Sequence, residues 1–345
     1  MMAKQVTGLA LSFLLSALIS TTRASINWTL TDTHIHAIPP ILAQAIAAAG
    51  GDPSGNPTPE WSLEGTLSSM ASIGSARGVL SISTPGVPIA GTGQAARDLC
   101  RELNLYLGNL TAQNPNTLDF FAALPDWRDL DGTLAEIDWI FSVQKSSVGV
   151  VFYTGYGNYL PGDPLFAPIW TKLNSYKALT FMHPGVMEVT PFLINGNFPQ
   201  PIVDYPQQTT RAAVDLVISG TRTRTPNVDM ILAHAGGTLP YISERILGAI
   251  LLEGYSNVSE PEASSQFSRF YYDFALSATT TQLDALLDQT TPNHIFLGSD
   301  YPYTPALGIV GNQVEYLAWA ATHPQLSPAV LATNAQIEIG SHKLS

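Results

Sequence analysis

Eight short apolar runs recur along this chain of 345 residues, and their repetition constrains the fold more than any other feature. Each run is rich in β-branched, aromatic and small apolar residues, and each precedes a polar or Gly/Pro-rich turn and usually a helix-like segment. Near-continuous apolar character is typical of parallel strands that are buried on both faces. We expect these strands near residues 28–36, 76–83, 118–124, 148–154, 179–183, 230–234, 270–276 and 295–299.

The segments between the strands predict helices. The clearest lie at residues 94–110, 134–142, 210–219, 239–252 and 281–288. Eight βα units in succession predict an α/β fold, a closed (β/α)8 barrel of the TIM type, and a chain of this length can form such a barrel as one domain. An open doubly wound sheet is the alternative, but no Gly-rich phosphate-binding sequence follows the first strand. We therefore place one barrel domain over residues 25–345.

Two stretches exceed what a minimal barrel needs. Residues 50–60 are rich in Gly and Pro, and residues 186–206 carry Phe192, Phe198, Tyr205 and several prolines. Long loops inside compact domains are usually functional or mobile. We interpret the second stretch as a lid or pocket wall.

Composition and charge narrow the classes of partner and site. Hydrophobic residues make up 45% of the chain and charged residues 12%, which is enough apolar material for a large core. A formal net charge of −12 argues against binding to nucleic acid, because that needs clustered Lys and Arg. The single Cys100 excludes an intramolecular disulfide and a Cys-rich zinc cluster. Any metal ion must therefore be bound through His and carboxylate side chains.

Residues 1–24 have the pattern of a secretory signal peptide. Lys4 gives a weak positive start, residues 9–19 form an apolar run, and Thr22-Arg23-Ala24 offers a small-residue cleavage site. An uncleaved anchor is the alternative, but the run is shorter than the ~20 residues that span a bilayer. We expect cleavage, no stable membrane span afterwards, and a protein of the secretory pathway that is secreted, vesicular or vacuolar.

Three acceptor sequences for N-glycosylation fit the same route. They begin at Asn27, Asn109 and Asn257, whereas the similar sequence at Asn56 is excluded by Pro57. We expect glycans at the three acceptor asparagines.

Polar side chains stand at the ends of four expected strands. His34 and His36 close the first strand and, because alternate strand residues face the same side, both would point into the barrel. His183, His234 and Asp300 close the fifth, sixth and eighth strands, at the end of the barrel where active sites are built. The alternative is five separate buried polar residues, each of which would need its own partner. One metal ion would supply the partner for four of them.

This pattern resembles the amidohydrolase superfamily. More narrowly, residues 204–213, 234–245 and 298–303 resemble the aminocarboxymuconate-semialdehyde decarboxylase-like branch, and within it the chain is most similar to fungal 6-methylsalicylate decarboxylases. The resemblance spans the mature chain and implies a barrel of the metal-dependent hydrolase kind.

The resemblance also implies roles for the residues at the strand ends. His34, His36, His183 and Asp300 become ligands of one divalent metal ion, Zn²⁺ in the first place with Mn²⁺ also compatible, and His234 becomes a catalytic acid/base. Dinuclear members place a carboxylated lysine at the end of the fourth strand. Residues 150–154 read Val-Val-Phe-Tyr-Thr here, without lysine, which favours one ion.

The implied reaction is the nonoxidative decarboxylation of a small aromatic hydroxy acid, with 6-methylsalicylate as the best candidate in a polyketide secondary-metabolite pathway. Asp300 would then also be catalytic, delivering a proton to the ring carbon while His234 relays or polarises. Two alternatives stay open. One is hydrolysis of a lactone or amide, with metal-bound water as nucleophile and His234 as its base. The other is a secreted binding protein without turnover.

Aromatic residues after three strands could enclose a planar substrate. They are Trp127, Tyr153, Tyr156, Tyr159, Tyr301 and Tyr303. Packing against neighbouring loops is the simpler alternative for each of them. Arg245 matches a position from which a family arginine reaches the site of a neighbouring subunit in a homodimer, although a surface ion pair would also account for it.

Four further polar residues are assigned supporting places. Asp32 and Asp273 are candidates to hold the ligand imidazoles in the right tautomer. His294 and His323 occupy no motif position, and we expect both to be structural or exposed.

Overall fold

The computed structural model describes residues 30–343 except positions 83, 145 and 187. The expected signal peptide and Asn27 lie outside these described residues. Eight parallel strands follow one another around a single sheet in chain order, as the sequence predicts. They are β1 (Leu30–Ala37), β2 (Ser75–Ile82), β3 (Leu118–Ala122), β4 (Ser147–Tyr153), β5 (Leu179–His183), β6 (Asp229–Leu232), β7 (Tyr271–Asp273) and β8 (Ile295–Phe296).

The sheet closes on itself just beyond β8. The backbone N–H of Thr33 donates to the carbonyl of Leu297 at 2.9 Å, and the N–H of His36 donates to the carbonyl of Tyr301 at 2.7 Å. These bonds place the segment after β8 beside β1, with single bridges from Asp32 to Leu297 and from Ile35 to Tyr301. The expected (β/α)8 barrel is therefore confirmed.

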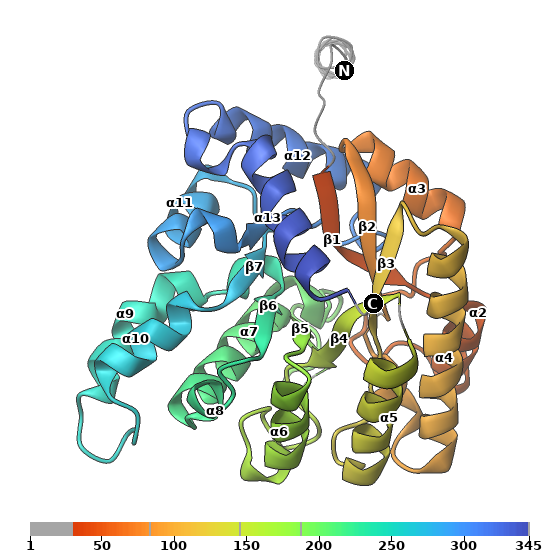
Figure 1. The fold of residues 1–345 in the computed structure, drawn as a ribbon, viewed down its shortest axis with the longest axis horizontal. Coiled ribbons are helices and arrows are strands. Elements are labelled where there is room, and N and C mark those ends of the chain that lie inside the picture. Colours follow the sequence, from red (N-terminus) through yellow and green to blue (C-terminus); the bar gives the residue numbers. More distant parts are fainter. Residues whose placement is uncertain (1–29, 83, 145, 187, 344–345) are drawn as a thin grey trace.

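Helices surround the strands, and α13 crosses one end of the barrel (Figure 1). The α-helices are α2 (Pro40–Ala48), α3 (Leu63–Ser72), α4 (Gln94–Gln113), α5 (Leu130–Val143), α6 (Ala167–Ser175), α7 (Gln200–Ile218), α8 (Thr221–Arg224), α9 (Leu239–Ile250), α10 (Glu260–Ser268), α11 (Thr280–Gln289), α12 (Ala306–Ala320) and α13 (Pro328–Ser341). Short 3₁₀ turns lie at Val87–Ala90, Pro164–Phe166, His234–Gly236, Pro292–His294 and Pro324–Leu326. Within the described part of the chain, no helix is both long and apolar enough to cross a membrane.

Side-chain caps fix where several helices begin. Ser62 accepts a hydrogen bond from the N–H of Gly65 at the start of α3, and Asp129 does the same for Gly132 at the start of α5. Thr279 and Gln282 form a reciprocal capping box on α11. Such caps satisfy backbone donors that the first helical turn leaves unpaired.

The barrel interior is filled by its own apolar cluster. Phe121, Phe181 and Phe296 project into it from three strands, and Ala335 and Ile339 of α13 close it from the N-terminal ends of the strands. The helices pack around the outside in a second, larger cluster. Because apolar side chains fill the interior, the polar residues that close the strands gather above Phe181, at the C-terminal ends of the strands.

The stretch at residues 186–206 differs from the expected loop. Helix α7 already begins at Gln200, and Pro201 is tolerated in its first turn because the N–H group that proline lacks would be unpaired there. The part before α7 packs against the other insertion, where Gly55 leaves no room for a side chain next to Leu193. The N–H of Gln200 also donates to the carbonyl of Ser54 at 3.3 Å. The two insertions therefore form one joined structure, and its role as a lid stays a prediction.

Candidate metal centre

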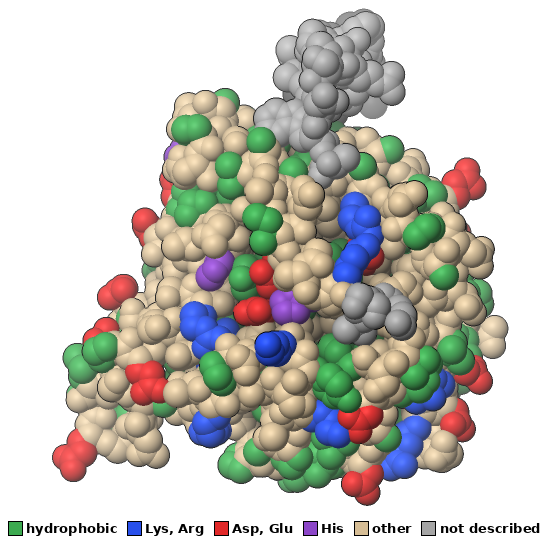
Figure 2. Space-filling model, viewed as in Figure 1, with side chains coloured by type: hydrophobic (Ala, Val, Ile, Leu, Met, Phe, Trp, Pro, Cys, Tyr) green, Lys and Arg blue, Asp and Glu red, His purple; other side chains and the backbone are tan. Residues whose placement is uncertain are grey.

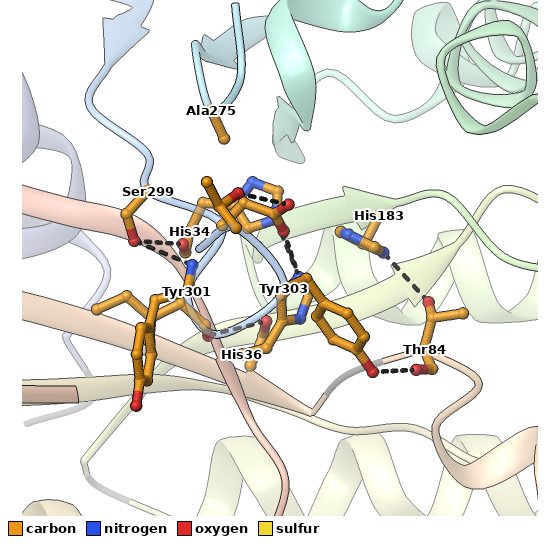
Figure 3. A network of polar contacts seen from close by, with 12 residues as sticks. His34, His36, Thr84, His183, Ala275, Ser299, Tyr301 and Tyr303 are labelled. Atoms are coloured by element: carbon orange, nitrogen blue, oxygen red, sulfur yellow. Dashed lines mark hydrogen bonds and ion pairs between the residues drawn. The ribbon is translucent and has the colours of Figure 1, made fainter. Parts of the chain in front are cut away.

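The four expected ligands meet at the C-terminal ends of the strands. His34, His36, His183 and Asp300 are all buried, and one ligand atom from each lies within 4.8 Å of the others. His34 and His36 stand on β1, His183 ends β5, and Asp300 follows β8. Figure 3 shows the three imidazoles and their polar contacts.

The ligand atoms are spaced as around a single ion. The Nε2 atoms of His34 and His36 are 3.2 Å apart, and Asp300 Oδ1 lies 3.4 Å from the first and 3.0 Å from the second. Atoms bound about 2.0–2.2 Å from one ion lie roughly 3–3.5 Å from each other. Three imidazole nitrogens and one carboxylate suit Zn²⁺ and also accept Mn²⁺. The residues therefore fit one divalent cation.

Hydrogen bonds on the far side of two rings turn the Nε2 atoms toward the cluster. His34 Nδ1 lies 3.0 Å from Asp273 Oδ2, so the expected supporting role of Asp273 is seen directly. His183 Nδ1 lies 2.8 Å from the carbonyl of Pro184 and 3.2 Å from Thr84 Oγ1. With each Nδ1 carrying the proton, Nε2 presents its lone pair to the ion.

Asp32 plays a different part from the one expected. Its Oδ1 accepts from the backbone N–H groups of His34 and Ser299, at 3.2 and 3.1 Å, and among the described residues no imidazole is hydrogen-bonded to Asp32. It therefore ties β1 to the segment after β8. Burial raises the pKa of Asp32 to about 7.

The backbone at two site residues is held in the left-handed region. Asp300 has a φ of 61° and His234 a φ of 55°, and a non-glycine residue pays roughly 1–2 kcal/mol for such a conformation. The N–H of Asp300 donates to the carbonyl of His34 at 3.0 Å, and Thr304 Oγ1 donates to Asp300 Oδ2 at 3.2 Å. These contacts hold the Asp300 carboxylate in place although its backbone conformation is unfavourable. Such strained backbone is typical of functional sites.

Opposing electrostatic effects act on the cluster. Burial would raise the pKa of Asp300, but hydrogen bonds from His234, His34 and His36 hold it well below the usual range. Burial works to lower the pKa of His34, yet Asp273 and Asp300 raise it to about 10. Burial lowers the pKa of His36 and His183. The cluster therefore holds an ionised carboxylate at Asp300 and uncharged imidazoles at His36 and His183, whereas His34 keeps a second proton that it must lose before its Nε2 can bind a metal ion.

His234 lies beside the cluster, where the sequence places it. Its Nε2 is 3.9 Å from Asp300 Oδ2, and its ring centre is 4.8 Å from that of His34. Its Nδ1 is buried and has no hydrogen-bond partner among the described residues. The imidazole is therefore placed to exchange a proton with Asp300 or with a bound molecule.

Trp127 lies outside the ligand cluster. Its side chain is fully buried and stacks between Phe152 and Tyr156, each 5.1 Å away between ring centres. Phe152 points outward from β4, so Trp127 belongs to the layer between strands and helices. This packing gives no support to the predicted contact of Trp127 with substrate, which stays a prediction.

Tyr301 points away from the ligand cluster, whereas Tyr303 lies against it. A side chain at Gly65 of α3 would meet the Tyr301 hydroxyl, so this tyrosine is directed at α3. The ring of Tyr303 stands edge-on to His36, 5.2 Å away between centres, and its hydroxyl donates to the carbonyl of Thr84 at 3.3 Å. Figure 3 shows the two rings diverging.

The remaining predicted site residues lie on different parts of the barrel. Tyr153 is buried at the end of β4, and its hydroxyl donates to the carbonyl of Ile82 at 3.2 Å. It lines a cavity of about 210 Å³ near the barrel mouth. Arg245 is exposed on α9 and has no ion pair among the described residues. Asn109 on α4 and Asn257 before α10 are both exposed.

Two histidines outside the motifs are structural, as expected. His294 Nδ1 lies 3.2 Å from the carbonyl of Ser268, and His323 stacks on Trp319. Thr84 and Thr304, by contrast, support the ligands and were not foreseen. Their places after β2 and β8 are the only signal the sequence offers for them.

Comparison with known proteins agrees with this geometry. Residues 31–336 match the Amidohydrolase family. The decarboxylase macB of Penicillium terrestre is 36% identical over 83% of this chain and 89% of its own. The 6-methylsalicylic acid decarboxylase of Penicillium expansum is 37% identical over 79% and 85%.

A solved structure shows the same fold. The 5-carboxyvanillate decarboxylase of Novosphingobium aromaticivorans, crystallised with bound manganese, aligns with a TM-score of 0.77 at 15% identity, covering 91% of this chain and 97% of that one. The likeness to the fungal relatives extends over most of both chains, and the family match covers the whole barrel. The chain therefore belongs to the amidohydrolase family.

Proposed function

We propose that this carboxy-lyase of the amidohydrolase family converts 6-methylsalicylate to 3-methylphenol and carbon dioxide in a polyketide secondary-metabolite pathway. The observation that carries the proposal is the likeness, over most of the chain, to fungal decarboxylases that include one named for this acid. The intact set of four ligands with His234 beside it supports turnover rather than binding alone.

The four ligands would hold one divalent ion, with Zn²⁺ as the first choice and Mn²⁺ as the alternative. When bound, the cation supplies a positive charge that orients the carboxylate and the neighbouring phenolic oxygen and draws electron density from the ring. The edge-on ring of Tyr303 would border the substrate next to His36.

The chain's own residues handle the proton. Asp300 is ionised at rest, so a proton must first reach its carboxylate, and His234 Nε2 at 3.9 Å is the nearest imidazole outside the ligand set. Asp300 then delivers this proton to the ring carbon that bears the carboxylate. The bond from that carbon to the carboxylate breaks, its electron pair restores the aromatic ring, and carbon dioxide leaves.

Reaction in D₂O tests this assignment. The account expects one deuterium in 3-methylphenol, at the carbon between the hydroxyl and methyl positions. Asp300→Asn that still holds its metal ion should yield no deuterated product. Undiminished incorporation by that variant would exclude Asp300 as the donor.

Hydrolysis of a lactone or amide would use the same residues, with His234 as the base. Mass analysis separates the reactions, because decarboxylation removes carbon dioxide and hydrolysis adds water. Metal-loaded protein that turns over none of the salicylates, resorcylates, lactones or amides would favour a secreted binding protein.

We also propose that the protein passes through the secretory pathway and carries glycans. The pattern of residues 1–24 and the exposure of Asn109 and Asn257 support this route. Cell fractionation with endoglycosidase treatment is the test, with and without residues 1–24. An unglycosylated cytosolic pool of the full-length chain would contradict it. A homodimer in which Arg245 reaches the partner's site stays a prediction, which the molar mass in solution and Arg245→Ala would test.

A further inference from the structure

A second group of metal-binding side chains lies at the other end of the barrel. Asp229 begins β6, and Glu338 and His342 stand one helical turn apart at the end of α13. The metal centre lies at the C-terminal ends of the strands, so the two groups are separated by the apolar interior of the barrel. Figure 2 shows acidic and histidine side chains gathered near the middle of this face, where α13 ends in Figure 1.

The spacing in this group equals that of the first. His342 Nε2 lies 3.2 Å from Asp229 Oδ2 and 3.3 Å from Glu338 Oε1. One ligand atom from each residue lies within 4.8 Å of the others. Ligand atoms of one ion with bonds of about 2.0–2.2 Å are separated by roughly 3–3.5 Å. The three side chains therefore need little movement to bind a common ion.

Glu338 has the most buried side chain of the three residues. The residue is 9% exposed, and its Oε1 is buried and accepts no hydrogen bond from the described residues. His342 Nε2 is hydrogen-bonded to Asp229 and lies at an ion-pair distance of 3.3 Å from Glu338 Oε1. A buried carboxylate oxygen without a donor is unusual, and a cation would satisfy it.

The surroundings leave space for the remaining ligands. Asp229 and His342 line a surface cavity of about 550 Å³, together with Asn227 and Ser341. Water molecules could therefore complete the coordination. The cavity also contains Lys177 and Lys343, and Lys343 Nζ is already engaged with Asp119 Oδ1 at 2.9 Å.

We propose that Asp229, Glu338 and His342 form a second, structural site for a divalent transition-metal ion of the Zn²⁺ class. One imidazole and two carboxylates are the ligand types that Zn²⁺ accepts. The ion joins the last turn of α13 to the start of β6 and thereby fastens the helix that closes the barrel. A metal-free ion pair between protonated His342 and the two carboxylates is the competing explanation.

The test counts bound Zn²⁺ in the full chain after chelation, reloading and removal of free ion. We expect two ions per chain in the wild type and one in Glu338→Gln, which keeps the side-chain size. His183→Ala, which disables the catalytic centre, should also keep one. His323→Ala is the matched control, since it removes a histidine from another surface, and it should keep two.

Thermal unfolding supplies a readout that does not depend on activity. Zn²⁺ should raise the Tm of His183→Ala and should leave that of His183→Ala/Glu338→Gln unchanged, with circular dichroism confirming that both are folded. One ion in the wild type, or an equal count in wild type and Glu338→Gln, would overturn the proposal. If the wild type binds one ion and His342→Ala has a lower Tm than the wild type, the group is the metal-free ion pair.

Discussion

Asp273 lies against His34 although the two residues are 239 positions apart, with its Oδ2 3.0 Å from the ring Nδ1. Its other oxygen accepts from the N–H of Ala275 at 2.9 Å and from that of His234 at 3.3 Å. One carboxylate at the end of β7 therefore orients a ligand from β1 and anchors the backbone of the proposed acid/base.

Replacing this carboxylate should weaken metal binding without removing a ligand. Asp273→Asn no longer fixes the proton on His34 Nδ1, and we expect affinity for Zn²⁺ to fall about 10–100-fold. Competition with a chelating dye measures the affinity. Asp284→Asn is the control, since Asp284 is a half-exposed carboxylate near His323. Equal affinities for Asp273→Asn and wild type would show that the contact does not orient the ligand.

Gly298 packs closely against both Asp273 and His34. A Cβ at this position would lie 2.8 Å from Asp273 Oδ1 and 2.9 Å from the Cβ of His34, so Gly298→Ala must displace one of them. We expect a loss of Zn²⁺ affinity of at least about tenfold, as for other disturbances of supporting groups. Gly311→Ala, where a Cβ meets nothing within 4 Å, should bind Zn²⁺ as the wild type does. A normal affinity of Gly298→Ala would contradict the packing described here.

Tyr303 and Tyr301 form a matched pair for testing which ring borders the substrate. Of these two tyrosines only Tyr303 stands against a ligand imidazole, so Tyr303→Leu should lower kcat/KM about tenfold or more, a change of about 1.4 kcal/mol. Tyr301→Leu removes a ring of the same size directed at α3 and should change kcat/KM much less. Steady-state kinetics on metal-loaded protein decide between the two. A larger effect at Tyr301 would reverse the assignment.

Asp129 gives a pH-dependent contribution to folding. Its carboxylate caps α5 and binds Arg97 through two hydrogen bonds of 2.5 and 2.6 Å, which lower the pKa of Asp129 although burial opposes this. Because the folded-state pKa is below the unfolded value of about 3.9, the stabilisation is complete above that pH and is lost as the pH falls through the folded pKa. Asp129→Asn keeps a capping oxygen but loses the charge that pairs with the partly exposed Arg97, and should cost about 0.5 kcal/mol at pH 7.

Urea unfolding at pH 7, 5 and 3 measures this contribution. The difference in the free energy of unfolding between wild type and Asp129→Asn should be the same at pH 7 and 5 and smaller at pH 3. Asp131→Asn, at an exposed carboxylate in the same helical turn, should show a smaller gap throughout. A gap that widens toward pH 3 would have the wrong sign for this account.

Most of the fold and the four candidate ligands could be predicted from the pattern of apolar strands. Parallel strands buried on both faces leave a plain record in the sequence, and their polar last residues must gather at one end of a barrel. The structure brings His34, His36, His183 and Asp300 together as the sequence predicts, because each lies in a strand or shortly after one, and the direction of the strands is known.

In the loops after the strands, the direction of a side chain could not be predicted from the sequence. Tyr301 follows Asp300, whose left-handed φ interrupts the alternation from which the direction of a side chain is inferred. Trp127 lies five residues past the end of β3, where no periodicity applies, and packing decided its place. Long-range contacts such as that of Thr84 with His183 leave no local signal.

Mass analysis of 6-methylsalicylate after incubation with the metal-loaded protein tests the central claim most directly. The account predicts that the acid disappears with stoichiometric formation of 3-methylphenol and carbon dioxide, and that chelation of the metal ion stops the reaction. Unchanged acid in the presence of folded, metal-loaded protein would contradict it. The same protein hydrolysing a lactone or amide, with a product that has gained water, would then favour the alternative reaction.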